Sequence, residues 1–481
     1  MKFSAIFAIV ALICVFGDRT AAQDKKPNII LIVTDDQRAD TLAYMPKLNE
    51  LLVQRGTSFT NAIITTPTCC PSRATILTGQ YAHNHGVRQN EKEFTRELDK
   101  RDSQTLATWL KTGGYKTGLI GKYLNGYSFG YIPPGWDTFQ AFGKRHYYNY
   151  KLSNFIDGVL KDPLIYGSAE ADYSTDVLAV KAVDFIKSAD NGDEPFFLMW
   201  TPNAPHRPAV PARRHEQAFA DLAPHRPSSF NVSDKGFWDR KWWSKGGRTL
   251  SANRIAKIDA LRKSMLQALL AVDEAVEKIV DTLITINKLE NTVIIFLSDN
   301  GFHWGEHQIT DKRSPYDESI RVGMVVFDGR NQTKRTNDAL VANIDLAPTI
   351  LDYAGLKTPN NVDGVSLLPL LSGEQAQLRN HVLIQIFPET FASTSNAFIG
   401  VRGANSVYFE RDGVIWASKE YFDMTKDPHQ LKNLVTDSEF EGDVAAHKAA
   451  LNHLRSCAGA SCNETPKAEL QPVAADAKPP S

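Results

Sequence analysis

Cysteine, net charge and long hydrophobic runs are all scarce in this chain of 481 residues. Lys and Arg together number 54 and Asp and Glu 55, so the formal net charge is -1. This balance excludes a global field that would attract nucleic acid, and we expect any electrostatic specialisation to be local. The apolar run at the N-terminus is too short to cross a bilayer, and no later stretch is long and apolar enough to do so, so we expect no transmembrane segment.

The one apolar run lies at the N-terminus. Lys2 precedes an almost unbroken apolar stretch at 5–17, and small residues follow at 20–22. This pattern predicts a signal peptide at residues 1–22 that is removed after Ala22. An uncleaved N-terminal anchor is the alternative. We therefore expect an exported protein that is extracellular or lysosomal, or periplasmic if the source is bacterial.

Of the five cysteines, Cys14 would leave with the signal peptide. In an exported protein Cys457 and Cys462 could close a small disulfide loop. Cys69 and Cys70 are adjacent, and a disulfide between them would be strained. Three Asn-x-Ser/Thr sequons are candidates for glycosylation: Asn231, Asn331 and Asn463.

Short apolar strands alternate with amphipathic helices over most of the chain. We expect strands at 28–33, 116–120, 195–200 and 292–297, and helices at 45–55, 105–112 and 255–284. The alternation predicts an α/β fold with helices around a largely parallel sheet. Strand-like pieces at 382–386, 397–402, 406–410 and 414–418 precede a helix at 443–454. They predict a small antiparallel sheet.

These patterns divide the chain into three parts. Residues 27–378 are the expected catalytic domain, and residues 379–464 are a C-terminal subdomain with the small sheet and its helix. Residues 465–481 are rich in Pro and Ala without periodicity and are expected to form a disordered tail.

Polar residues follow the strands of the expected catalytic domain. They are Asp35, Asp36, Lys122, His206, Asp299 and Asn300. In open α/β sheets, sites form at the carboxyl ends of the strands. We therefore group these six residues into one site.

The segment from Thr68 to Gly79 reads TCCPSRATILTG. Pro71 suits the first turn of a helix and Gly79 suits its end. Cys69 would then lie at the helix N-terminus, where unpaired amides and the helix dipole favour an anion such as sulfate. Arg73, on the first turn, can face the same anion.

Cys-x-Pro-Ser-Arg followed by Leu-Thr-Gly resembles the signature of the formylglycine-dependent sulfatases of the alkaline-phosphatase superfamily. The resemblance extends from about Pro27 to Cys462. The segments at 69–73, 121–125, 133–136 and 311–313 are most similar to N-acetylglucosamine-6-sulfatases and heparan endosulfatases. The resemblance implies an alkaline-phosphatase-like sandwich with an additional small C-terminal sheet.

The resemblance also implies a specific chemistry for Cys69. A formylglycine-generating enzyme would oxidise Cys69 to formylglycine, whose hydrated aldehyde would take up sulfate through one hydroxyl and release it through the other. A serine ester would lack that second hydroxyl. Cys70 is not expected to be modified.

Four residues match the family's metal ligands: Asp35, Asp36, Asp299 and Asn300. Their oxygen donors suit a hard cation, so we expect calcium, with magnesium as the alternative, and expect the hydrated residue 69 to complete the coordination sphere. Asp35 and Asp36 alone could instead be capping carboxylates in a turn.

Four cations would offset the negative charge in this pocket: Arg73, Lys122, Lys312 and His206. By resemblance, Arg73 and Lys122 would hold the formylglycine and the sulfate. His206 would assist release of the sulfate or contact it, and Lys312 would lie near the leaving oxygen and could protonate it.

One departure bears on the substrate. Many arylsulfatases read Lys-x-His where this chain has Lys122-Tyr123-Leu124-Asn125, so Asn125 could approach the nucleophile instead. This change favours a sulfated sugar, with N-acetylglucosamine 6-sulfate as the first candidate.

Weaker candidates surround this core. His303, and also His83 and His85, could line the pocket or only support it. The basic aromatic stretch from Trp238 to Lys245 could bind sulfated sugars or simply pack over the sheet. Three other functions stay open: a broad-specificity arylsulfatase, a phosphonate or phosphate monoester hydrolase of the same superfamily, and a catalytically inactive glycan-binding protein.

Overall fold

The computed structural model describes residues 25–90, 101–144, 146–190, 192, 194–232, 249–388, 397–411 and 418–464. The expected signal peptide at 1–22, the basic aromatic stretch from Trp238 to Lys245 and the expected tail at 465–481 lie outside these residues. Among the helices in the described residues, none is long and apolar enough to cross a membrane.

A large mixed sheet forms the centre of the molecule, with the strand order β10-β2-β9-β8-β1-β7-β3-β4-β5-β6 and β11 paired with β2. Its strands are β1 (Asn28–Thr34), β2 (Thr57–Ile63), β3 (Lys116–Gly121), β4 (Thr138–Ala141), β5 (Tyr150–Ile156), β6 (Val159–Tyr166), β7 (Phe196–Thr201), β8 (Thr292–Ser298), β9 (Arg321–Asp328), β10 (Arg335–Asn337) and β11 (Val341–Ala342). The run β8-β1-β7-β3-β4 is parallel throughout. Because β9 is antiparallel to both β8 and β2, the sheet is mostly but not wholly parallel.

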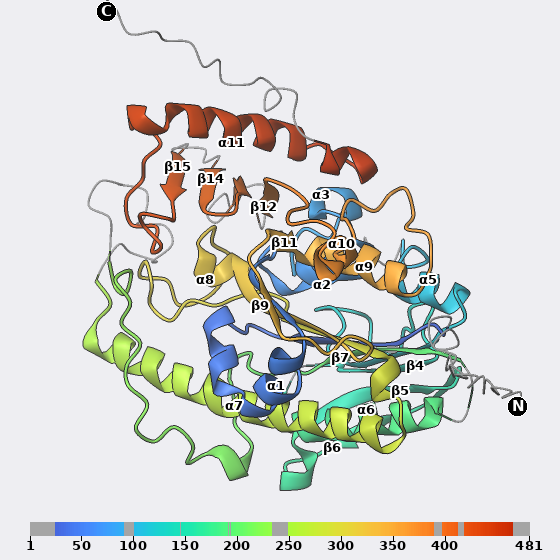
Figure 1. Ribbon diagram of the computed structural model, residues 1–481. Coiled ribbons are helices and arrows are strands. Elements are labelled where there is room, and N and C mark those ends of the chain that lie inside the picture. The colour runs from blue at the N-terminus through green and yellow to red at the C-terminus, as the bar shows by residue number, and fades with distance from the viewer. Residues whose placement is uncertain are drawn as a thin grey trace, which may run out of the picture.

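Helices cover both faces of this sheet (Figure 1). One face carries α1 (Pro46–Leu51), α6 (Ser174–Ala189) and α7 (Ala252–Thr285), and the other carries α2 (Cys69–Thr78), α5 (Leu106–Thr112), α9 (Leu346–Tyr353) and α10 (Leu368–Ser372). Strand β1 explains why both faces are needed. Ile30 and Ile32 pack into one core cluster, whereas Ile29, Leu31 and Val33 pack into the other. A strand buried on both faces is apolar at nearly every position.

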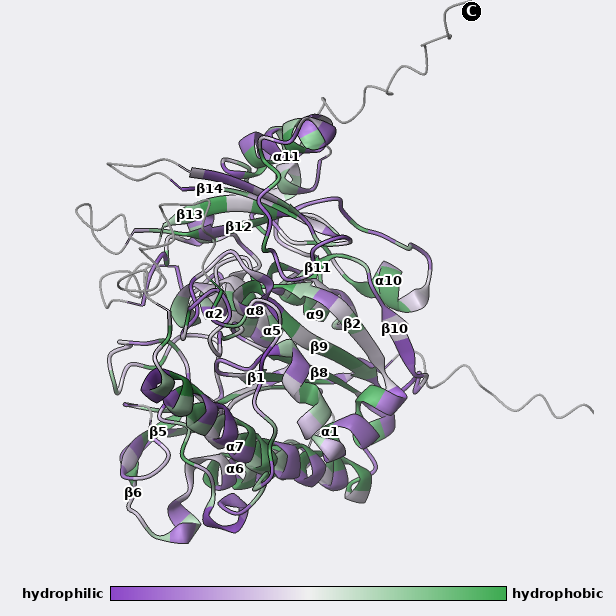
Figure 2. Ribbon diagram, turned by 90° about the vertical axis from the view of Figure 1, so that its left-hand side faces the viewer, coloured by the Kyte–Doolittle hydropathy of each residue, from purple (hydrophilic) through white to green (hydrophobic). Residues whose placement is uncertain are grey.

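The hydropathy of the strands agrees with this arrangement. The internal strand β9 is largely green in Figure 2, whereas the edge strand β10 is purple. The expected α/β sandwich is therefore confirmed. The expected helix at 45–55 was too long, because α1 ends at Leu51 and a separate 3₁₀ turn spans Val53–Arg55. The chain turns there into β2, and a Cβ on Gly56 would lie 2.6 Å from the carbonyl oxygen of Val326.

A second, four-stranded antiparallel sheet lies beside the first, in the order β12 (Val382–Ile386), β13 (Phe398–Arg402), β14 (Ser406–Arg411) and β15 (Ser418–Asp423). Helix α11 (Glu441–Leu454) packs on it (Figure 1). The expected small antiparallel sheet is thus confirmed. The strand expected at 414–418 lies outside the described residues except for Ser418, where β15 begins. The domain boundaries remain predictions.

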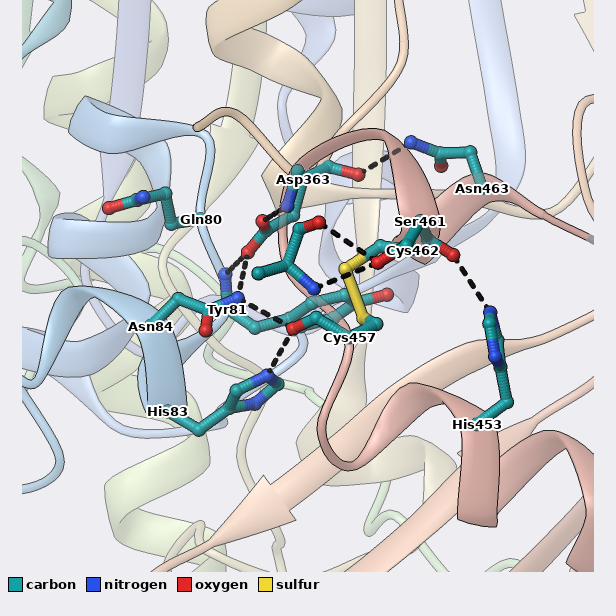
Figure 3. Close-up of a disulfide and its surroundings, with 12 residues drawn as sticks. Gln80, Tyr81, His83, Asn84, Asp363, His453, Cys457, Ser461, Cys462 and Asn463 are labelled. Atoms are coloured by element: carbon teal, nitrogen blue, oxygen red, sulfur yellow. Dashed lines mark hydrogen bonds between the residues drawn. A yellow bond between two sulfur atoms is a disulfide. The ribbon is translucent and has the colours of Figure 1, made fainter. Parts of the chain in front are cut away.

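The C-terminal disulfide loop is fastened to the segment that follows α2. Cys457 and Cys462 form the expected disulfide, with their Cα atoms 5.0 Å apart. Figure 3 shows the carboxylate of Asp363 between this loop and Tyr81. It accepts hydrogen bonds from the backbone amides of Gly459 (2.6 Å) and Tyr81 (2.8 Å). The small-sheet region is therefore tied to the short segment between Gly79, the C-cap of α2, and helix α3 (Ala82–His85).

Candidate active site

The polar residues grouped from the sequence meet at one edge of the large sheet. Asp35 and Asp36 follow β1, and Asp299 and Asn300 follow β8, where Thr34 is paired with Ser298. On the other side, β3 and β7 end in register at Gly121 and Thr201, just before Lys122 and the loop of His206. The parallel register therefore carries four separate loops to the same place.

Helix α2 presents Cys69 to this edge. Cys69 is its first residue and is buried, with Sγ 3.6 Å from Asp35 Oδ1 and 2.9 Å from Lys312 Nζ. The helix ends at Gly79, which adopts the left-handed conformation (φ 65°) that the sequence predicts for this glycine. One early amide is already occupied, because the Cys70 N–H donates to Asn90 Oδ1 at 2.9 Å.

Two cations bridge the acidic residues. Arg73 Nε lies 2.8 Å from Asp299 Oδ2, and Arg73 Nη1 donates to the Lys122 carbonyl oxygen at 2.9 Å. Lys122 Nζ lies 2.5 Å from Asp35 Oδ2 and 3.7 Å from Asp299 Oδ2. Arg73 Nη2 is buried without a hydrogen-bond partner among the described residues. A spare guanidinium donor at this position can bind an anionic oxygen.

Asp36 contacts three other site residues. It has a positive φ of 67° and receives Lys312 Nζ and Asn300 Nδ2 on the same oxygen, Oδ1, with the asparagine at 2.8 Å. Its other oxygen, Oδ2, lies 3.6 Å from His206 Nε2. Backbone strain of this kind persists where the surroundings over-determine it, as they do at binding sites.

Two buried oxygens here have no hydrogen-bond partner among the described residues, namely Asp36 Oδ2 and Asn300 Oδ1. Leaving buried polar atoms unpaired is costly, so such atoms call for an explanation. The candidate ligand atoms of Asp35, Asp36, Cys69 and His206 all lie within 4.8 Å of one another and could hold a metal ion. The donor set therefore fits a cation.

This group differs in part from the four ligands expected from the sequence. It includes His206, which we had placed among the cations, and it does not include Asp299. The carboxylate of Asp299 is instead occupied by Arg73 and by the backbone amide of Asp36, which lies 3.2 Å from Asp299 Oδ1. Asp299 still lies within the same network.

Burial and neighbouring charges shift the pKa values of the site residues in different directions. Burial alone would raise the pKa of Asp35, but the charges of Lys122, Arg73 and Lys312 outweigh it and hold that pKa well below its usual value. Burial alone would lower the pKa of Lys312, but the negative charges of Asp36, Asp35 and Asp299 raise it well above its usual value. For His206, burial prevails over the nearby carboxylates and lowers the pKa. Lys312 is thus held protonated and His206 neutral.

The remaining candidates fall around this centre. The backbone N–H of Asn125 donates to Cys70 Sγ at 2.8 Å. The buried side-chain Oδ1 of Asn125 has no hydrogen-bond partner among the described residues. Burial raises the pKa of Cys70 to about 12, so this thiol stays neutral. His303 is fully buried and its Nε2 lies 2.7 Å from Ser314 Oγ, two residues beyond Lys312.

The other two histidines do not reach the site. His83 Nε2 lies 3.0 Å from the Cys457 carbonyl oxygen, and His85 Nε2 lies 3.1 Å from Thr75 Oγ1. Sequence reasoning missed Tyr147, whose hydroxyl donates to the His206 carbonyl oxygen at 2.8 Å from 59 residues away. No local pattern marks Tyr147. It also missed Arg38, which the charged run after Asp35 and Asp36 could have indicated.

A buried thiol among carboxylates and cations, at the strand-end edge of an α/β sandwich, defines a hydrolase-type site. The sulfatase profile matches residues 27–356, and a profile described as N-sulphoglucosamine sulphohydrolase, C-terminal, matches residues 305–457. The chain is 34% identical to human N-acetylglucosamine-6-sulfatase, with 93% of this chain and 87% of that protein aligned. The chain belongs to the sulfatase family.

Two further similarities are informative. A Caenorhabditis elegans homologue of extracellular sulfatase Sulf-1 is 35% identical over 378 residues, and the match spans 76% of this chain but about half (52%) of that protein. A solved structure of a protein in complex with its substrate D-glucosamine-2-N,6-O-disulfate aligns with a TM-score of 0.73 and 24% identity. That alignment covers 90% of this chain and 98% of the other, and it shows a shared fold.

Proposed function

We propose that this chain is a sulfuric ester hydrolase in which Cys69 is converted to formylglycine and releases sulfate from sulfated sugars. The observation that carries the proposal is the position of Cys69. It begins α2, lies 3.6 Å from Asp35 and 2.9 Å from Lys312, and is surrounded by buried acidic and basic side chains. Reactive cysteines typically lie in electropositive surroundings of this kind.

The metal would be held by Asp35, Asp36, Asp299 and Asn300. Their donors are all oxygen, so we propose calcium, with magnesium as the alternative. After conversion, residue 69 presents oxygen where the thiol now lies, which removes the one soft donor from the cluster. The cation would neutralise the carboxylates and polarise the sulfate.

One hydroxyl of the hydrated aldehyde at residue 69 would lose its proton and bind sulfur while the bond from sulfur to the sugar oxygen breaks. The second hydroxyl would then lose its proton, the bond between residue 69 and the sulfate would break, and the aldehyde would re-form. Arg73 and Lys122 would hold this group and the sulfate oxygens, which fits the spare Nη2 of Arg73. Lys312 would give a proton to the leaving alcohol, since its ammonium reaches the nucleophile position.

His206 is suited to accept the proton in the release step. Its Nδ1 lies 2.6 Å from the Arg207 carbonyl oxygen, and a carbonyl can only accept a hydrogen bond, so Nδ1 carries the hydrogen. In the neutral ring Nε2 is therefore the free acceptor, and it faces Asp36 inside the site.

For the substrate we propose a sulfated sugar, with N-acetylglucosamine 6-sulfate as the first candidate. Asn125 stands where many arylsulfatases have histidine, and the human relative that aligns over most of its length is an N-acetylglucosamine-6-sulfatase. The backbone N–H of Asn125 donates to the Sγ of Cys70, the residue next to the nucleophile. A direct substrate contact by His303 remains a prediction, which its full burial does not support.

Two further proposals concern maturation and destination. A formylglycine-generating enzyme would act on Cys69, and the chain would be exported to an extracellular or lysosomal compartment, or to the periplasm of a bacterium. The disulfide between Cys457 and Cys462 supports an oxidising compartment. The sequons at Asn331 and Asn463 are exposed, whereas Asn231 is half-buried and accepts the Leu250 N–H at 2.7 Å.

The test combines product analysis with peptide mass spectrometry. Purified protein should release sulfate from N-acetylglucosamine 6-sulfate and from an aryl sulfate, measured by ion chromatography, and release far less phosphate from the matched aryl phosphate. The peptide containing Cys69 should carry the mass of an aldehyde. An active preparation in which Cys69 is wholly a thiol would refute the mechanism, and faster phosphate than sulfate release would favour a phosphatase.

A further inference from the structure

A buried arginine links the two loops that bear the acidic residues. Arg38 lies two residues beyond Asp36, and its Nη1 donates to the Phe302 carbonyl oxygen at 2.9 Å, two residues beyond Asn300. The same Nη1 lies 2.8 Å from Glu306 Oε1. Arg38 thereby joins the loop after β1 to the loop after β8, in each case two residues beyond an expected metal ligand.

The guanidinium is held in place on every side. Its Nε and Nη2 form a two-point contact with Asp40, each at 2.9 Å, and its plane lies over the Trp304 ring with 4.5 Å from Cζ to the centroid. Arginine is the residue suited to such an arrangement, because its planar fork binds a carboxylate at two points and stacks on an aromatic face.

Glu306 completes the link from the other loop. It is fully buried, and its Oε2 accepts the backbone N–H of Trp304 at 2.6 Å. Its Oε1 lies 2.8 Å from His225 Nε2 and 2.8 Å from Arg38 Nη1. The same loop continues to Lys312, whose ammonium contacts both Asp36 and Cys69. Glu306 and Arg38 therefore set the path of the chain on which Asn300 and Lys312 are carried.

We propose that Arg38 and Glu306 are positioning residues that hold the loops after β1 and β8 in the geometry needed to bind the metal and to place Lys312. This inference rests on the proposed metal site. Arg38 binds the Phe302 carbonyl oxygen and Glu306 binds the backbone N–H of Trp304, so both act through the backbone they bind. Outer partners of metal ligands commonly contribute 10- to 100-fold in metal affinity or activity.

The experiment measures calcium binding separately from catalysis. For wild type, Arg38→Lys, Glu306→Gln and Asp40→Asn, the melting temperature is recorded against calcium concentration, and kcat and KM are measured at saturating calcium. We expect Arg38→Lys and Glu306→Gln to need about 10-fold more calcium for half of the thermal shift. We also expect kcat to fall more than KM changes, because Lys312 is displaced relative to residue 69.

Asp40→Asn keeps the proposal testable if the other variants fold poorly. The Asp40 side chain is about half exposed (48%), so its loss removes one support of the guanidinium with little effect on folding. It should shift the calcium midpoint in the same direction by a smaller factor.

Arg214→Lys is the matched control. Arg214 also contacts two carboxylates, those of Asp176 and Glu274, but it lies between helices α6 and α7. It should leave the calcium midpoint unchanged.

The outcomes separate the two levels of inference. If wild type binds calcium and the folded Arg38, Glu306 and Asp40 variants keep its calcium midpoint and kcat, the positioning role is wrong and the ion pair only stabilises the fold. If wild type itself shows no thermal shift with either calcium or magnesium, the proposed metal site fails and this inference fails with it.

Discussion

Lys312 Nζ lies 2.9 Å from Cys69 Sγ, although the two residues are 243 positions apart in the chain. The same ammonium contacts Asp36, so one cation links the nucleophile position to the acidic cluster. An oxygen that replaces the thiol at residue 69 would therefore be formed within reach of a proton donor. This relationship connects the sulfatase signature to the loop after β8.

The first prediction concerns the two adjacent cysteines. Cys69→Ala should fold with a near-normal melting temperature and lose essentially all sulfatase activity, because it removes the reactive group while leaving the helix intact. Cys70→Ala should keep activity within about 10-fold, although it removes the acceptor of the Asn125 N–H and should lower the melting temperature. Substantial turnover by Cys69→Ala, or an aldehyde on Cys70, would contradict the assignment.

The second prediction concerns metal removal. Dialysis against a chelator should abolish activity and lower the melting temperature, because Asp35 and Asp36 would lose the cation that pairs with them. Calcium, or magnesium less effectively, should restore both, as measured by metal analysis and turnover on the same sample. Asp299→Ala should lose metal and activity, whereas Asp259→Ala, which removes a surface partner of Arg226, should lose neither. Recovery with stoichiometric zinc alone would refute an oxygen-only calcium site.

The central strands could be predicted closely because burial on both faces leaves an uninterrupted apolar run. Strands β1, β7 and β8 lie within one residue of the expected bounds. Strand β6 was missed, since it lies at the sheet edge with mostly exposed residues and owes its conformation to pairing with β5. Strand β2 pairs with β9, and the paired residues are 258 to 269 positions apart, which no local pattern reveals.

Within the site, residues that directly follow a strand or belong to the signature could be placed from sequence. The contacts of loop residues could not. Only the family resemblance of segment 311–313 placed Lys312 near the reacting groups, since its periodicity does not predict the contact with Cys69. Nothing around Tyr147 predicts its bond to the His206 carbonyl. The pairing of Asp299 with Arg73 likewise depends on the relative placement of α2 and β8, which sequence periodicity does not contain.

The third prediction concerns the C-terminal disulfide. The loop between Cys457 and Cys462 is short, so replacing both by serine should cost about 2 kcal/mol of stability from loop entropy. Gly459 in this loop and Tyr81 both bind the Asp363 carboxylate. Loss of the disulfide should therefore increase hydrogen exchange around Tyr81 but not in α7. Hydrogen exchange measured on both regions of the double variant checks this. Unchanged protection near Tyr81 would show that the loop is held without its disulfide.

The fourth prediction concerns acid stability. The Val87 N–H donates to His85 Nδ1 at 3.0 Å, so this nitrogen must be unprotonated, and burial, with the charges of His83 and Arg101, lowers the pKa of His85 to about 3. The unfolded chain protonates near pH 6.5. Stability from this residue is therefore complete above about pH 6.5 and falls as the pH drops towards 3, by up to about 1.4 kcal/mol per pH unit.

His85→Gln should flatten this dependence, because glutamine can accept from Val87 and donate to Thr75 without titrating. The melting temperature between pH 7 and pH 5 should drop less in the variant than in wild type. Equal drops would mean that other buried histidines dominate, with His303, whose pKa burial lowers to about 4, as the next to replace.

The last prediction separates the proposed general acid from groups that only bind sulfate. A sugar alkoxide is a poorer leaving group than a phenolate, so its departure depends more on proton donation, which typically contributes 10²- to 10⁴-fold. Lys312→Ala should therefore reduce turnover of N-acetylglucosamine 6-sulfate far more than turnover of an activated aryl sulfate, at one pH and saturating calcium. Arg73→Lys should reduce both equally, because the sulfate it holds is common to the two substrates. His206→Ala should reduce turnover of both substrates alike, because His206 accepts a proton in the release step that the two substrates share. A larger penalty on the sugar sulfate would mean that His206 also protonates the leaving oxygen. Equal penalties for Lys312→Ala on the two substrates would remove the acid role from Lys312 and leave it as a partner of Asp36 and residue 69.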